Sequence, residues 1–102
     1  METNRKTTYA ISIHSALGPK KGILCLDIQE HDLSGKLSIL GFTTTFSGGK
    51  ASHNNYIFPC TLKTATGIIA GNIHLLEEEG TLHGMAETAK GCLAITGKRC
   101  DS

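Results

Sequence analysis

The sequence is poor in aromatic residues and has no excess of either charge. Its 102 residues include no Trp, two Tyr and three Phe, and ten Lys plus Arg are balanced by nine Asp plus Glu. Nucleic-acid binding needs a basic surface, and single-strand binders add aromatic side chains on which bases stack. The composition therefore argues against nucleic acid as a partner.

Long apolar runs are also missing. The chain opens METNRKTTY, where a secretory signal would place seven or more apolar residues, and no run approaches the length that spans a membrane. The four cysteines follow no C-x-x-C spacing and are expected to be free thiols in a reducing compartment; they are Cys25, Cys60, Cys92 and Cys100. We expect a cytoplasmic protein without a membrane partner.

Catalytic and cofactor motifs are absent too, because no G-x-S-x-G, H-E-x-x-H, P-loop or Rossmann fingerprint occurs. The acidic run 77–79 is expected to be a solvated turn before Gly80. His74 and His83 should be direct or diagonal neighbours across a hairpin, but a zinc site needs three or four protein ligands. The sequence therefore predicts no catalytic residue, no metal site and no cofactor.

The sequence does contain apolar alternation with a period of two. It is clear at 9–13, 23–28, 33–39 and 42–48. No window sustains the i, i+3, i+4 spacing of an amphipathic helix. The turn-like connections between the segments are too short for crossover helices, so successive strands should pair as antiparallel hairpins.

The same pattern occurs twice. Sliding the sequence by 49 positions aligns residues 9–50 on 58–99 without a gap. The matches concentrate in alternating apolar positions and in glycines, which are the residues a backbone path requires. The paired glycines include Gly35 with Gly84 and Gly48 with Gly97. We predict one domain over residues 1–102, built from two tandem four-stranded repeats.

Eight consecutive antiparallel strands can avoid exposed edges by closing, and the interior of an eight-stranded wall is just filled by side chains. The predicted fold is all-β: an eight-stranded antiparallel up-and-down barrel, with a two-sheet β-sandwich as the alternative. The paired glycines fall on the inward parity, where a missing side chain permits the bend that closes a sheet. Alternation places these residues inside: Tyr9, Ile11, Ile13, Leu24, Leu26, Ile28, Leu33, Leu37, Ile39, Phe42, Phe46, Phe58, Cys60, Leu62, Ile73, Leu75, Leu82, Leu93 and Ile95.

The meander, the L-x-G strand starts at Leu33 and Leu82 and the strand ends FSGGK and ITGKR resemble small bacterial calycin-like barrels, of the streptavidin and lipocalin kind. The resemblance covers residues 9–99 and implies a closed barrel. Lipocalins carry a G-x-W signature near the first strand, and avidin-type biotin sites are walled by Trp. Because this chain has no Trp, the resemblance assigns no ligand residue and no biotin site.

The two halves differ inside the predicted barrel. Leu37, Ile39 and Phe42 in the first half correspond to the smaller Ala86, Thr88 and Gly91 in the second. Unless neighbours fill the lost volume, a small apolar pocket lies beside the last two strands. The alternative is that Phe42, Phe46 and Phe58 lean across and close it. The predicted pocket residues are Tyr9, Phe42, Phe46, Ala86, Thr88 and Gly91.

The outer face is less polar than expected for a lone barrel. The residues that alternation places on the outer face include the apolar Ile23, Leu76, Met85 and Ala94. Such residues form an interaction-prone patch if they cluster. Self-association through these residues, as a homodimer, is the simplest interpretation. The alternative is that loops or the N-terminal arm cover them.

Three functions remain open from the sequence. The first is a non-catalytic barrel that binds a small apolar ligand. The second is an interaction or subunit protein with a filled core, which acts through self-association or another protein partner. The third is an enzyme that uses the mouth of the barrel as a cavity.

Overall fold

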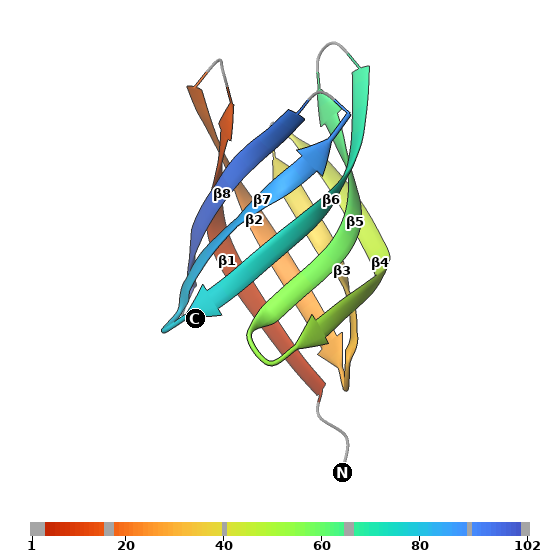
Figure 1. The fold of residues 1–102 in the computed structure, drawn as a ribbon, viewed down its shortest axis with the longest axis vertical. Coiled ribbons are helices and arrows are strands. Elements are labelled where there is room, and N and C mark those ends of the chain that lie inside the picture. The colour runs from red at the N-terminus through yellow and green to blue at the C-terminus, as the bar shows by residue number, and fades with distance from the viewer. Residues whose placement is uncertain (1–3, 16–17, 40, 65–66, 90, 101–102) are drawn as a thin grey trace.

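The chain forms one closed barrel of eight antiparallel strands in sequence order (Figure 1). The computed structural model describes residues 4–15, 18–39, 41–64, 67–89 and 91–100. The strands are β1 (Asn4–Ser15), β2 (Gly18–Gln29), β3 (Asp32–Ile39), β4 (Phe42–Ser52), β5 (Asn55–Thr64), β6 (Gly67–Glu78), β7 (Thr81–Thr88) and β8 (Gly91–Arg99). The predicted all-β up-and-down barrel is confirmed, and the two-sheet alternative is wrong.

Each strand pairs with its sequence neighbour, and β8 returns to β1. This closing ladder runs from the pair Tyr9 and Arg99 to the pair His14 and Ala94. The β2–β3, β4–β5 and β6–β7 connections lie at one end of the barrel, at the bottom of Figure 1, which we call the lower end. The ends at which β1 meets β2, β3 meets β4, β5 meets β6 and β7 meets β8 lie at the opposite, upper end. The described residues contain no helix that is long and apolar enough to span a membrane.

Several strands are longer than the alternation predicted. The segment 48–55, which follows the alternating segment 42–48, belongs mostly to β4 and β5, because Lys50, Ala51 and Ser52 pair with residues of β5. The turn is left with His53 and Asn54 alone. The extension brings Tyr56 into the interior, where it is 1% exposed.

A β-bulge in β4 distinguishes the first half of the chain from the second. Leu33 pairs with Gly49 while Gly35 pairs with Phe46, so β4 carries one extra residue between these pairs. Gly48 takes the bulge conformation at φ 77° and is exposed, and Gly49 takes the inward position predicted for Gly48. The second half has no such shift, because Leu82 pairs with Gly97 and Gly84 with Ile95.

The hairpins of the two halves share their registers up to that bulge. Thr7 pairs with Leu26 as Tyr56 pairs with Leu75, which is the same register displaced by the repeat length. The matching registers agree with the predicted tandem repeat, and the bulge marks where a gapless repeat stops describing the backbone. A common origin of the two halves stays a prediction.

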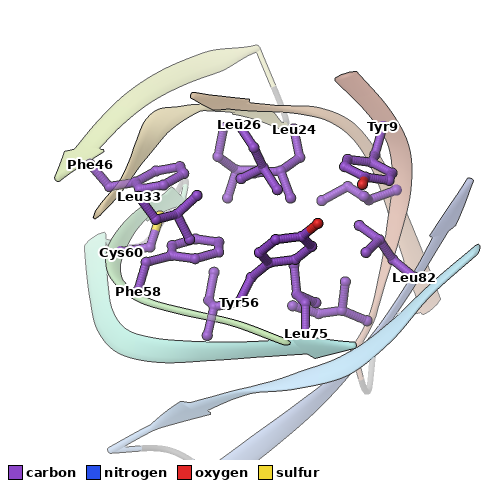
Figure 2. Close-up of a cluster of buried hydrophobic side chains, with 14 of the residues drawn as sticks. Tyr9, Leu24, Leu26, Leu33, Phe46, Tyr56, Phe58, Cys60, Leu75 and Leu82 are labelled. Carbon is purple, nitrogen blue, oxygen red and sulfur yellow. The ribbon is translucent and has the colours of Figure 1, made fainter. Parts of the chain in front are cut away.

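The core fills the barrel, and alternation predicted most of it. The described side chains assigned inward are buried with two exceptions. Phe42 is 43% exposed, Leu93 is partly buried, and the Leu62 side chain lies outside the described part of the chain. The Phe46 and Phe58 rings stack with centroids 4.1 Å apart and planes 14° apart. Figure 2 shows this pair on one side of the interior and Tyr9 on the other.

Candidate functional site

Polar side chains from four strands meet inside the lower end. Glu77 of β6 accepts hydrogen bonds at Oε1 from the hydroxyl of Tyr9 on β1 and from Nη2 of Arg99 on β8, the latter at 3.1 Å. Arg5 of β1 donates from Nη2 to the Tyr56 hydroxyl of β5 over 2.9 Å. The Glu77 side chain is only 13% exposed. We call these five residues the lower-end network.

The lower-end network is paired within itself. Burial, and then the hydrogen bond to Glu77, raises the pKa of Tyr9 well above its usual range. The Tyr9 hydroxyl stays protonated and donates a hydrogen bond to the Glu77 carboxylate. Arg99 supplies the opposite charge to Glu77. The network therefore supplies partners for the buried Tyr9 hydroxyl and the nearly buried Glu77 carboxylate, and Tyr9 belongs to it instead of the predicted ligand pocket.

The sequence interpretation missed Glu77 because it placed the run 77–79 in a solvated turn. β6 continues to Glu78, and Glu77 shares the inward parity of Leu75. A usable signal was present in the repeat: Glu77 stands where the first half has the buried Ile28. A charge at an inward repeat position indicates a paired group, since an unpaired buried charge is costly.

The upper end of the interior is apolar and less completely covered. Ile69 and Leu93 are only partly buried, and the Phe42 ring lies at the rim. Thr44 and Thr88 also face the interior side at intermediate exposure. Among the described residues, Ile69 and Leu93 near the upper end are thus less completely buried than the interior side chains toward the lower end, such as Tyr56 and Leu82.

Lys20 adds a positive charge to this rim. It is the register partner of Ile13, a buried interior residue, and directly opposed residues of an antiparallel pair project to the same face of a sheet. Lys20 is half-buried, whereas its neighbour Lys21 pairs with Ser12 and is exposed on the outer face.

The six residues predicted to line one pocket do not lie together. Phe42, Thr88 and Gly91 lie at the upper end, since Phe42 pairs with Ile39 and Thr88 with Gly91. Phe42 keeps the predicted inward parity, but it starts β4 next to Gly41 and therefore leaves the core at the rim.

The other three residues of the predicted pocket lie deeper in the barrel. Ala86 is 1% exposed and fully covered by its neighbours. Phe46 stacks on Phe58 in the middle of the barrel, and Tyr9 joins the network at the lower end. Aromatic side chains thus fill the centre, as the alternative interpretation of the sequence expected for Phe46 and Phe58.

Three of the four residues predicted for self-association lie on one wall. Met85 of β7 pairs with Ala94 of β8, and Leu76 of β6 is the diagonal neighbour of Met85. Ile23 lies on β2 between Ala10 and Ser38 and belongs to a different part of the surface.

His74 and His83 occupy the same wall as diagonal neighbours, because His74 pairs with Met85 and Leu76 with His83. His74 Nε2 lies 3.5 Å from Glu87 Oε1. The described residues contain no group of three or more His, Cys, Asp and Glu that could hold a metal ion. All four cysteines are free thiols, and burial raises the pKa of Cys60, inside the barrel, to about 11.

Comparison with known proteins supports the fold. No protein-family model matches the chain, and no curated protein does. Among solved structures, the chain is similar to a de novo designed fluorescence-activating beta barrel, with a TM-score of 0.54 and 12% identity over 93% of this chain and 91% of that one. At this identity the likeness concerns barrel topology alone and does not extend to the streptavidin or lipocalin kinship suggested by the sequence.

Proposed function

We propose that the protein is a non-catalytic β-barrel that binds a small apolar ligand at its upper end. The observation that carries the proposal is the unequal cover of the two ends of the interior. Tyr56 and Leu82 are at most 1% exposed toward the lower end, where the lower-end network lies. Ile69 and Leu93, which face the interior near the upper end, remain partly exposed.

Apolar surface at the upper end is the source of binding free energy in this proposal. Each square ångström of apolar surface removed from water contributes about 25 cal/mol. The polar groups there are few, and the Thr88 hydroxyl already donates to the Gly91 carbonyl oxygen over 2.8 Å. A ligand with few hydrogen-bonding groups therefore has the smallest free-energy cost of leaving water.

The position of Lys20 narrows the ligand class. Its register opposite Ile13 and its partial burial allow its aliphatic stem to lie along the apolar inner surface with the ammonium group at the rim. A negative group on the outer end of an otherwise apolar ligand would pair with that ammonium. The proposed ligand is therefore an amphiphile with an apolar chain or ring and an anionic end.

The experiment is an NMR titration with 1-octanol as an uncharged apolar probe. Thr44 faces the interior near the upper end, whereas Thr45 is exposed on the outer face. Thr44→Phe should fill the site and raise the apparent Kd at least tenfold, and Thr45→Phe should leave it within twofold. A wild type whose spectrum does not respond to octanol, or equal weakening in both variants, would show the proposal to be wrong.

A further inference from the structure

The outer wall carries two equivalent hollows, one in each half of the chain. Each lies over an inward-facing glycine, Gly35 or Gly84, at which an added Cβ would clash with a carbonyl oxygen of the adjacent strand. The first is bordered by residues of β1 to β4 and the second by residues of β5, β6 and β7. Most of their lining positions correspond under the 49-residue shift; the exceptions are Thr45 and Phe46 of the first hollow and Glu87 of the second.

The two hollows differ in the chemistry of their borders. Thr8, Asp27 and Lys36 border the first hollow. The corresponding residues of the second are Ile57, Leu76 and Met85, which are 48%, 37% and 44% exposed. We call these three residues, together with His74 and His83, the apolar wall.

The fold does not require the apolar wall. The equivalent hollow of the first half has polar residues at the same positions of the same hairpins, so the barrel closes with either chemistry. Large apolar side chains that cluster on the surface of a monomer expose apolar area to water, and such patches typically mark interaction sites. The difference between the halves therefore points to a covered surface in the working form of the protein.

We propose that the apolar wall is the interface of a homodimer with twofold symmetry. An isologous interface requires one surface to be complementary to itself. The wall meets this requirement because Ile57 and Met85 project beside the hollow over Gly84, so a ridge of one copy can enter the hollow of the other. This contact lies outside the barrel and is independent of the ligand proposed above.

Charge is compatible with a second copy as the occupant. The formal net charge of +1 leaves two copies with little mutual repulsion. On the wall itself, the Glu87 carboxylate lies beside His74. Three neighbouring strands form a strip only about 15 Å wide, and a standard interface buries about 800 Å² per partner. Because the strip is narrow for a standard interface, the dimer should be weak and should form only at high protein concentration.

The test is sedimentation velocity over a concentration series that reaches about 1 mM protein. Met85→Glu places an unpaired charge in the interface and should keep the protein monomeric where the wild type is dimeric. Lys36→Glu is the matched control, because Lys36 occupies the equivalent position of the first hollow. This control should dimerise as the wild type does.

A second pair of variants guards against effects on folding. Ile57→Asp should abolish the dimer and Thr8→Asp, its repeat equivalent, should retain it, with the strand content of each verified by circular dichroism. A wild type that is monomeric at the highest concentration overturns the proposal. A dimer that survives both Met85→Glu and Ile57→Asp overturns it as well, because the interface would then lie elsewhere.

Discussion

Single residues distinguish the two ends of the barrel. Glu77 takes an inward position that the repeat assigns to an apolar side chain, and it gathers the hydroxyl of Tyr9 and the guanidinium of Arg99. A buried carboxylate without these partners would be costly, so the three side chains stabilise the lower end as a unit. No comparable set joins the interior side chains described at the upper end, where Lys20 stands beside Ile13.

Lys20 and Lys21 give the sharpest comparison between adjacent residues. Lys20→Met should lower the affinity for octanoate about twofold to fivefold, since a partly exposed ion pair contributes about 0.5 to 1 kcal/mol. The affinity for 1-octanol should stay the same, because the alcohol carries no charge. Lys21→Met, on the outer face, should change neither affinity.

Two outcomes of the NMR titrations would contradict the role of Lys20. One is equal binding of octanoate and octanol by the wild type. The other is an equal loss of octanoate affinity in Lys20→Met and Lys21→Met, which would indicate a general electrostatic effect. Either outcome leaves the apolar site itself in place, provided that octanol binds.

At the scale of elements, the period of two was sufficient to predict eight strands and most of the core. Strand limits were harder to predict, because polar turn-forming residues such as Lys50 and Ser52 also occur in paired strand ends. The bulge was hidden by the two consecutive glycines of FSGGK, either of which can occupy the inward position. Only the pairing of β4 with β3 selects Gly49 for it.

The close approach of β7 to β6 depends on Gly84. Gly84→Ala places a Cβ against the carbonyl oxygen of His74, so β7 must move away and the free energy of unfolding should fall by about 1 to 3 kcal/mol or more. Gly48→Ala is the control: its φ of 77° is strained for alanine, but nothing lies within 4 Å of the added Cβ. It should cost about 1 kcal/mol.

Urea denaturation of both glycine variants gives this comparison. If Gly84→Ala costs no more than Gly48→Ala, the close contact between β6 and β7 is not what excludes a side chain. Gly35→Ala should likewise lower the free energy of unfolding, because its Cβ would meet the carbonyl oxygen of Cys25.

At the scale of the whole molecule, the barrel departs from its internal repeat in the parts for which we propose functions. One end holds the lower-end network and the other leaves Ile69 and Leu93 partly exposed; one hollow is polar and the other apolar. The topology followed from alternation and short connections. The site did not, because the depth of each residue along the barrel axis depends on the stagger of the strands. The alternation alone placed Tyr9 and Gly91 in one pocket, although they lie at opposite ends of the barrel.

The central claim is that an apolar ligand enters the upper end of the interior, and the most direct test is to locate a bound ligand by intermolecular NOEs. The measurement uses 1-octanol bound to protein labelled at isoleucine, leucine and methionine methyl groups. We expect NOEs from the octanol chain to Ile69 and Leu93, the partly exposed residues of the upper interior. NOEs confined to Ile57, Leu76 and Met85 would place the ligand on the outer wall, and that result would contradict the claim.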